Sequence, residues 1–433
     1  MRTHRLPSVG QLDAAAPHEG FDPVPAAVEA IARGEIVVVV DDEDRENEGD
    51  LVMAAEHATT EKMAFIVRHT SGFVCVAMTG QRATTLGLPL MVPATENGEV
   101  LGTAFGVSVD ARDGVTTGIS AADRAVTANK LACSRTRADD LTRPGHMMPL
   151  LARAGGVLER AGHTEATVDL CRIAGLESVG VLCELVEDDG EMSRRASLFR
   201  FARRHDLRIV SVRDIIEYRR RNERIVSRVS EARIPTEFGD FAAYAFQAHD
   251  GVEHIALVAG APHLVDSATA ATPMVRVHSE CLTGDILGSL RCDCGPQLRD
   301  SLQAIAAEGS GVLVYLRGHE GRGIGLGAKL AAYGLQEAGY DTVDANLELG
   351  FPVDARNYAV AAAVLRDLGV TRVRLITNNP QKTSALAEYG IEVIERVALP
   401  PHVNPHNVDY LRTKDSRLGH SILPAVNVTE SAV

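Results

Sequence analysis

Ile36-Val37-Val38-Val39-Val40 is a continuous run of β-branched residues, which indicates a strand buried on both of its faces. A helical pattern at residues 26–33 precedes this run and is ended by Gly34. The rhythm continues through the first half of the chain, with strands expected at 73–78 and 180–186 and helices at 62–69, 121–131 and 165–174. Strands interleaved with helices predict a layered α/β or α+β domain.

A charged stretch at residues 214–228 breaks this rhythm and predicts an amphipathic helix with many arginines. These arginines could bind an anion, but a solvated face on a linker helix is the commoner meaning of such a pattern. A second series begins at Ile234, with strands expected at 255–258, 312–316 and 373–376 and helices at 297–307, 329–337 and 357–368.

No sequence period repeats across the two halves, so we expect two unrelated layered domains, of α/β and α+β class, joined by a charged helical linker. A chain of 433 residues also fits two domains better than one core. We place a loose tail at residues 1–22, a first domain at 23–222 and a second at 223–433.

The composition excludes several classes of protein. A formal net charge of -14 argues against a general nucleic-acid surface. No run approaches the ~18 apolar residues of a membrane span, and the first ten residues lack the apolar core of an export signal. Seven cysteines are too few for a disulfide framework, and we expect four of them to be reduced, buried thiols: Cys75, Cys133, Cys171 and Cys183. We therefore expect a soluble, cytoplasmic protein without a nucleic-acid or membrane partner.

The other three cysteines form a compact motif in the second half. They lie in Arg276-Val277-His278-Ser279-Glu280-Cys281 and in Arg291-Cys292-Asp293-Cys294-Gly295. No fourth Cys completes a tetrahedron, so the motif predicts a zinc ion with one open coordination position, as catalytic zinc sites have. Three buried structural cysteines are the alternative, but the adjacent Arg, Asp and Gly fit an apolar core poorly.

A glycine-rich segment that includes Arg322 follows the strand expected at 312–316. Gly323, Gly325 and Ala328 formally match a dinucleotide-binding fingerprint with Asp344 as its ribose-binding acid, which would suit an oxidoreductase. The match is weak, because glycine-rich turns are common and zinc with arginine suits phosphate chemistry better. The segment therefore favours a phosphate cradle in which Arg322 is a bidentate cation and glycine N–H groups approach the oxygens.

Together these motifs resemble GTP cyclohydrolase II over residues 231–425. The resemblance rests on the cysteine motif, Glu320-Gly321-Arg322, Asp354-Ala355-Arg356 and Thr377-Asn378-Asn379-Pro380-Gln381-Lys382, which occur in the family's order. It implies a reaction that opens the imidazole ring of GTP, releases C8 as formate and pyrophosphate as a second product, and leaves a diaminopyrimidinone ribosyl monophosphate.

The same resemblance assigns the residues of this site. One zinc ion per domain would be held by Cys281, Cys292 and Cys294. GTP would be bound by Arg276, Val277, His278, Ser279, Glu280, Gln297, Glu320, Gly321, Arg322, Thr342, Thr377 and Lys382. Asp354 matches the family's proton acceptor, Arg356 its proposed nucleophile, and Tyr333 a tyrosine near the purine. The role of Arg356 is held more loosely, since a guanidinium stays protonated near neutrality, and without the resemblance the Asp354 and Arg356 pair would be an ordinary surface ion pair.

In the first half, seven carboxylates lie within residues 41–50, directly after the Ile36 to Val40 strand. A solvated loop is the usual meaning of such a run, and an EF-hand fails because its twelfth position would be Ala55. An acidic loop at the carboxyl end of a buried strand suits Mg²⁺ or Mn²⁺ with a sugar phosphate. Thr164 is expected to cap a helix that begins at Glu165 and offers an anion site beside Arg160.

With Arg143-Pro144-Gly145-His146, these features resemble 3,4-dihydroxy-2-butanone 4-phosphate synthase over residues 23–222. The resemblance implies that D-ribulose 5-phosphate becomes formate and the four-carbon phosphate, with two Mg²⁺ or Mn²⁺ ions at Glu46 and His163. It assigns the substrate to Arg45, Glu46, Asp50, Arg160, Ala161, Gly162, His163, Thr164 and Glu184. His146 would enter the site of a neighbouring subunit, and carboxylates such as Asp50 or Glu184 would shuttle protons.

Together the halves resemble the bifunctional riboflavin biosynthesis enzyme, which implies a homodimer, and we expect both sites to be active. One alternative is a vestigial first half that serves only dimerisation, but the intact Glu46, His146, His163 and Glu184 speak against it. Another is a zinc-containing GTP-sensing protein, against which the open zinc position favours turnover.

Overall fold

The computed structural model describes residue 18, residues 20–260 and residues 272–418. It consists of two compact units, the first ending at Asn222 and the second beginning at Glu223. The tail predicted at residues 1–22 lies mostly outside the described residues. None of the described helices is long and apolar enough to cross a membrane.

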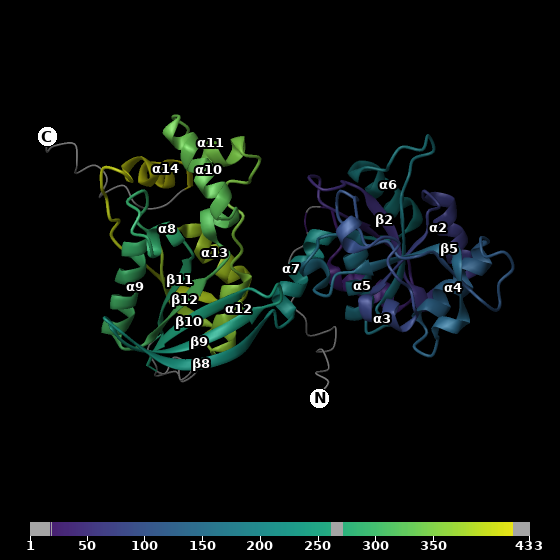
Figure 1. The fold of residues 1–433 in the computed structure, drawn as a ribbon, viewed down its shortest axis with the longest axis horizontal. Coiled ribbons are helices and arrows are strands. Elements are labelled where there is room, and N and C mark those ends of the chain that lie inside the picture. Colours follow the sequence, from purple (N-terminus) through teal and green to yellow (C-terminus); the bar gives the residue numbers. More distant parts are fainter. Residues whose placement is uncertain (1–17, 19, 261–271, 419–433) are drawn as a thin grey trace. The chain divides into compact units, whose positions relative to one another are not determined.

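The first unit is built around a seven-stranded mixed sheet with the order β4-β5-β3-β6-β2-β1-β7. Helices of this unit surround its strands (Figure 1). Its strands are β1 (Val37–Val40), β2 (Gly49–Ala54), β3 (Cys75–Thr79), β4 (Val109–Ala111), β5 (Leu141–Ala152), β6 (Val179–Glu184) and β7 (Arg208–Ser211). Its helices are α1 (Val24–Ala32), α2 (Thr60–His69), α3 (Gly80–Thr85), α4 (Ala121–Ala132), α5 (His163–Ile173), α6 (Arg195–His205) and α7 (Val212–Asn222).

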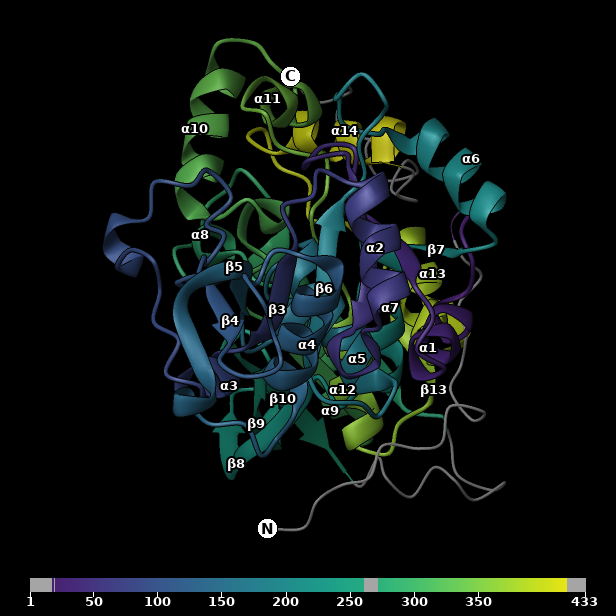
Figure 2. The ribbon, with the colours of Figure 1, turned by 90° about the vertical axis from the view of Figure 1, so that its right-hand side faces the viewer.

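Helices cover both faces of this sheet, and strand β1 shows why. Val38 and Val40 point into one core, which α2, α3, α4 and α6 complete. Val37 and Val39 point into a second core on the opposite face, completed by α1, α5 and α7. All four valines are buried, as alternate residues of a strand between two helical layers must be. The predicted layered class and the strand buried on both faces are confirmed; Figure 2 gives a second view of these elements.

The charged helix predicted over residues 214–228 differs from the observed one. Helix α7 ends at Asn222, and the chain re-enters a sheet as a strand at Val226. Arg219 is buried and donates hydrogen bonds of 2.7 Å to Asp169 and of 2.7 Å to the carbonyl of Gly155. The helix therefore packs as part of the first unit, because its apolar face and Arg219 have buried partners there. The prediction of a solvated linker helix was wrong.

The second unit has its own seven-stranded sheet, ordered β14-β13-β11-β12-β10-β9-β8. Its strands are β8 (Val226–Thr236), β9 (Gly239–Ala248), β10 (Glu253–Ala259), β11 (Met274–Ser279), β12 (Gly311–Leu316), β13 (Arg372–Ile376) and β14 (Glu392–Val397). Its helices are α8 (Leu282–Asp285), α9 (Cys294–Glu308), α10 (Leu326–Glu337), α11 (Thr342–Glu348), α12 (Ala359–Asp367), α13 (Pro380–Glu388) and α14 (Val408–Leu418). Strands β14, β13, β11 and β12 run parallel, and β10, β9 and β8 continue the sheet antiparallel.

The parallel strands of this unit place its polar loops at one edge of the sheet. Strands β11 and β12 are paired in register from Met274 with Gly311 to Ser279 with Leu316. Cys281 follows the end of β11, and the glycine-rich segment follows the end of β12. Because the carboxyl ends of parallel strands meet at one edge, the cysteine motif and the expected phosphate cradle lie side by side.

Candidate active sites

The acidic loop of the first unit connects the antiparallel strands β1 and β2, so it is a hairpin loop. Asp41, whose side chain is fully buried, organises it: one carboxylate oxygen accepts from the N–H of Glu48 at 2.8 Å, and the other from the N–H of Glu46 at 3.1 Å and from Arg45 at 2.7 Å. The loop therefore folds back over Asp41 instead of extending into solvent. Sequence reasoning did not single out Asp41, although it is the first carboxylate after the strand.

Glu46, Asp50 and His163 converge at the start of strand β2. The Nδ1 atom of His163 lies 3.4 Å from a carboxylate oxygen of Glu46 and 3.9 Å from Oδ1 of Asp50. Asp50 is also the cross-strand neighbour of Glu184 on β6, which places both carboxylates on one face. These residues line one pocket together with Arg45, Arg160 and Thr164. The structure thus brings together residues separated by more than a hundred positions.

Burial and neighbouring charges shift the pKa values of these three side chains. The hydrogen bond from His163 lowers the pKa of Glu46 to about 2. Burial raises the pKa of Asp50 to about 7. For His163, burial opposes the charged form, but the charge of Asp50 and the hydrogen bond to Glu46 outweigh it and raise the pKa to about 9.

This cluster fits a divalent cation. Single ligand atoms of Asp41, Glu46 and His163 lie within 4.8 Å of one another. Oδ1 of Asp50 and Nε2 of His163 are buried and have no hydrogen-bond partner among the described residues. Carboxylate oxygens and a deprotonated imidazole nitrogen suit Mg²⁺ or Mn²⁺ as ligands, and these two buried atoms are not engaged by other described groups. Asp41 already accepts three hydrogen bonds, so its role is to shape the loop.

Proton release should accompany cation binding here. His163 must lose its proton to become a ligand, and its raised pKa means that the proton is present at about pH 7.5. Cation affinity should therefore rise as the pH approaches about 9 and level off above it. Titration calorimetry with MnCl₂ in two buffers of different ionisation enthalpy measures the released protons. His163→Asn should abolish the buffer dependence, and equal heats in both buffers for the wild type would contradict the assignment.

The start of helix α5 differs from the expectation in one respect. Its N-cap is Gly162, so Thr164 lies inside the helix and the predicted cap was wrong. A Cβ atom at position 162 would lie 2.3 Å from a guanidinium nitrogen of Arg160, which crosses the helix start. Arg160 donates to Glu165 at 2.7 Å, to the Thr103 hydroxyl at 2.9 Å and to the carbonyl of Leu101 at 3.2 Å. Thr103 also lines the pocket, and sequence reasoning missed it.

His146 does not join this pocket. It lies on β5, where its Nδ1 is 2.6 Å from Asp110 of β4 and its backbone N–H donates to the same carboxylate at 2.9 Å. The side chain is 40% exposed. The buried Asp110 thus fixes one ring nitrogen of His146 and leaves the ring accessible from outside the unit.

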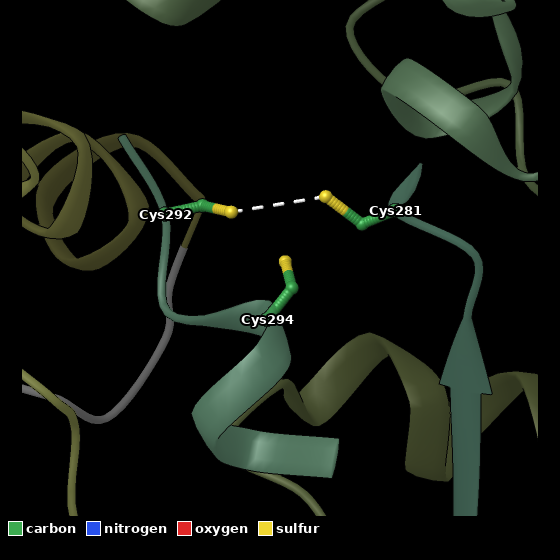
Figure 3. A group of neighbouring side chains, drawn as sticks. All are labelled: Cys281, Cys292 and Cys294. Carbon is green, nitrogen blue, oxygen red and sulfur yellow. Dashed lines mark hydrogen bonds between the residues drawn. The ribbon is translucent and has the colours of Figure 1, made fainter. Parts of the chain in front are cut away.

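The three cysteine side chains of the second unit point toward one another (Figure 3). Cys281 follows strand β11, Cys294 is the first residue of helix α9, and Cys292 lies two residues before it. The sulfur atoms of Cys281 and Cys292 are 3.7 Å apart, and all three lie within 4.8 Å of one another. A Cβ atom on Gly284 would lie 2.6 Å from the sulfur of Cys292, so the turn after Cys281 requires glycine. Hydrogen bonds from Cys292 and then Cys294 lower the pKa of Cys281, so the group readily supplies a thiolate.

The trithiol group fits zinc with an open position. Sulfur ligands suit Zn²⁺, and no fourth Cys, His, Asp or Glu belongs to the group among the residues that the structure describes. The cysteines line a pocket with Ser279, Glu280, Gly321, Arg322, Tyr333, Thr342 and Arg356, all of which the sequence assigned to this site.

Lys329 is a residue that the sequence did not assign to this site. Its buried ammonium group donates to the sulfur of Cys281 at 3.1 Å and to the Thr283 hydroxyl at 2.8 Å, and it forms an ion pair with Glu320. Glu320 in turn accepts from the backbone N–H of Leu282 at 2.6 Å. Glu320 and Lys329 thus support the loop that carries Cys281. In the sequence, Lys329 could have been noticed as a lysine within an otherwise apolar helical stretch.

Several other assigned residues lie behind the pocket lining. Arg276 donates to Gln297 at 2.8 Å and to the carbonyl of Ile376 at 3.0 Å, and Lys382 donates to the carbonyl of Val277 at 2.8 Å. His278 lies 3.0 Å from Asp285, which sequence reasoning missed. The assigned residues that do not line the pocket are Arg276, Val277, His278, Gln297, Glu320, Asp354, Thr377 and Lys382.

Arg322 and Arg356 give the pocket its positive charge. Arg322 has a left-handed backbone conformation with φ of 66°, and its Nη1 has no hydrogen-bond partner among the described residues. Such a conformation is costly and is typical of functional positions. Arg356 donates to Asp354 through Nε at 2.8 Å and through its backbone N–H at 3.0 Å. Burial opposes the charge of Arg356, but the hydrogen bond to Asp354 outweighs it and raises its pKa, which keeps the guanidinium protonated.

The fold and the two sites define a two-domain enzyme with a carboxylate–imidazole site for a sugar phosphate and a trithiol site beside a cationic pocket. Residues 25–218 match the family model of 3,4-dihydroxy-2-butanone 4-phosphate synthase, and residues 227–398 match that of GTP cyclohydrolase II. The chain belongs to the family of bifunctional riboflavin biosynthesis proteins, RibBA, as the sequence motifs predicted.

Two relatives and one solved structure support this assignment. Riboflavin biosynthesis protein RibBA of Nocardia farcinica is 56% identical over 406 residues, which cover 93% of this chain and 96% of that protein. Bifunctional riboflavin biosynthesis protein RIBA 1, chloroplastic, of Arabidopsis thaliana is 56% identical over 405 residues, which cover 93% of this chain and 74% of that protein. The crystal structure of RibBX, a two-domain 3,4-dihydroxy-2-butanone 4-phosphate synthase from A. baumannii, is 36% identical with a TM-score of 0.65 and covers 87% of this chain and 99% of that one.

Proposed function

We propose that both sites of this chain are active. The first unit converts D-ribulose 5-phosphate into 3,4-dihydroxy-2-butanone 4-phosphate and formate. The second converts GTP into 2,5-diamino-6-ribosylamino-pyrimidinone 5'-phosphate, formate and pyrophosphate. The observation that carries this proposal is the presence of two groups of metal-ligating side chains, Glu46 with His163 and the three cysteines, each lining a pocket with the cationic residues that a phosphorylated substrate needs.

In the first site, Glu46 and His163 would hold Mg²⁺ or Mn²⁺, with two ions per domain. Such ions, when bound, make the proton next to a carbonyl acidic. Asp50, whose pKa of about 7 lies near the working pH, is suited to accept and return that proton, with Glu184 beside it. Arg160 and the start of α5, with Gly162 as its N-cap, would receive the phosphate group, with Arg45, Ala161 and Thr164 around them.

In the second site, Cys281, Cys292 and Cys294 would hold one Zn²⁺ ion, which supplies Lewis-acid chemistry when bound. Arg322, whose Nη1 is unpartnered among the described residues, is suited to bind the triphosphate. Asp354, held by Arg356, is suited to accept a proton. The protonated state of Arg356 favours stabilisation of phosphate charge over nucleophilic attack by its guanidinium. Tyr333 lines the pocket beside the cysteines, where the purine would lie.

A homodimer would complete the first site. His146 lies outside the pocket of its own unit, and its exposed ring is held by Asp110. A second copy of the chain could therefore receive this imidazole in its pocket. This arrangement would explain why a histidine that Asp110 holds at 2.6 Å does not line the pocket of its own unit.

The proposal is tested by assaying the two reactions separately on the full chain. Formate should appear from D-ribulose 5-phosphate only with Mg²⁺ or Mn²⁺ present, and from GTP after zinc is supplied. A chain that forms formate from GTP alone would support the alternative of an inactive first unit. A chain that binds GTP without forming formate would support a nucleotide-sensing role.

A further inference from the structure

Helix α14 (Val408–Leu418) lies beyond residues 227–398, the part of the chain that matches the GTP cyclohydrolase II model. It nevertheless contributes Tyr410 to the pocket that the three cysteines line. In both ribbon views α14 lies beside α11, which carries Thr342 (Figures 1 and 2). The helix is therefore packed against the nucleotide site of its own unit.

Lys414 connects α14 to the loop between Cys292 and Cys294. Its ammonium nitrogen lies 3.2 Å from Oδ1 of Asp293, whose side chain is fully buried, while that of Lys414 is 11% exposed. A buried carboxylate that loses its cation is left with an uncompensated charge, so this ion pair matters for the loop around it. The same ammonium group lies 4.4 Å from the ring centroid of Tyr410 and helps to fix that ring.

A chain of polar contacts continues from this ion pair to strand β11. Oδ2 of Asp293 accepts from the side-chain amide of Gln297 at 2.6 Å. The amide oxygen of Gln297 accepts from Arg276 at 2.8 Å. Lys414 is thus linked through Asp293 and Gln297 to Arg276. Because each member fixes the orientation of the next, a change at Lys414 is transmitted to Arg276.

Two further contacts hold α14 in place. Leu411 is completely buried, with Val408 and Tyr410 packed against it. Arg417 forms ion pairs with Asp341, the N-cap of α11, and with Asp344 at a distance of 2.9 Å. Asp344, which resembled a ribose-binding acid of a dinucleotide fold, is thus engaged in anchoring α14. The anchors place the helix against both the cysteine loop and α11.

We propose that α14 completes the GTP site, with Tyr410 contacting the bound nucleoside triphosphate and Lys414 acting as a positioning residue that orients Arg276 through Asp293 and Gln297. This inference rests on the proposed GTP cyclohydrolase activity of the second unit. It extends the site beyond the residues that the motifs of the family define.

The test compares Lys414→Met and Lys414→Arg in the full chain, with zinc content, KM and kcat for GTP as readouts. We expect Lys414→Met to raise KM by about tenfold or more while zinc is retained and kcat falls less, as for a residue that supports substrate binding. Lys414→Arg should stay within about threefold of wild type, because the charge at Asp293 is preserved. Arg412→Met, at an exposed position of the same helix, is the matched control and should leave both constants unchanged.

Two more variants keep the test decisive if Lys414→Met folds poorly. Asp293→Asn combined with Lys414→Met removes the buried charge together with its partner, so folding and zinc content should recover while KM stays high. Tyr410→Ala should raise KM, and Tyr410→Phe should not. Wild-type KM in both Lys414→Met and Tyr410→Ala would overturn the inference, as would a loss that always accompanies loss of zinc. A wild-type chain that forms no formate from GTP would instead refute the proposed function.

Discussion

A Cys292→Ser variant should lose its zinc and its GTP cyclohydrolase activity while it still forms butanone phosphate from D-ribulose 5-phosphate. The sulfur of Cys292 lies 3.7 Å from that of Cys281, and serine offers a weakly acidic hydroxyl in place of a thiolate. With only two thiols left, the site cannot hold the ion, and we expect formate release from GTP to fall by well over about a hundredfold. Metal analysis per chain and the two formate assays measure the effect.

The control for this variant is Cys133→Ser, which removes a thiol at the end of helix α4 in the first unit. It should retain zinc and both activities. Because the two sites lie in separate compact units, the ribulose 5-phosphate reaction serves as an internal standard for the amount of folded protein. Full zinc occupancy in Cys292→Ser, or undiminished turnover of GTP, would contradict the assigned ligands.

The order of strands and helices was predictable where packing acts on short stretches. The valines of β1 are buried on both faces of the sheet, which is why the sequence has apolar β-branched residues at every position of this strand. Helix α7 was harder, because its arginines look solvated until the fold supplies Asp169 as the partner of Arg219. The switch from α7 to β8 at Val226 likewise depends on pairing with β9, which lies later in the chain.

In the two sites as well, the features set by short stretches of sequence were predictable and those that depend on long-range contacts were not. The cysteine motif and the acidic loop are local patterns whose chemistry follows from spacing. Lys329 reaches Cys281 across 48 positions, and Lys414 reaches Asp293 across 121. No local pattern identifies such pairs, because their chemistry exists only after the strands and helices bring them together. Asp41 and Asp285 escaped attention for a related reason, since they hold backbone groups and other side chains instead of lining the pockets.

A Glu46→Gln variant should abolish butanone phosphate formation and leave the GTP reaction unchanged. The substitution keeps the size of the side chain and removes the charge that pairs with His163 at 3.4 Å and Arg45 at 2.5 Å. A neutral amide is a weaker ligand for Mg²⁺ or Mn²⁺, and the loss of charge stabilisation should lower the rate by about a hundredfold or more. Calorimetric titration with MnCl₂ and the ribulose 5-phosphate assay measure the two effects.

The matched control is Glu43→Gln, three residues before Glu46 in the same acidic loop, where an exposed carboxylate pairs with Arg195 at 2.9 Å. It removes the same charge from the same loop without touching the cluster, so cation binding and rate should match wild type.

The pKa of about 2 for Glu46 also predicts a pH dependence of the free energy of unfolding. Because this pKa is lowered on folding, the charge of Glu46 stabilises the fold above about pH 4.5, and this contribution is lost as the pH falls toward 2. Of the two variants, only Glu46→Gln should therefore weaken the fall in unfolding free energy between about pH 4.5 and pH 2. Equal behaviour of the two variants would show that the general charge of the loop, and not Glu46 itself, supports the reaction.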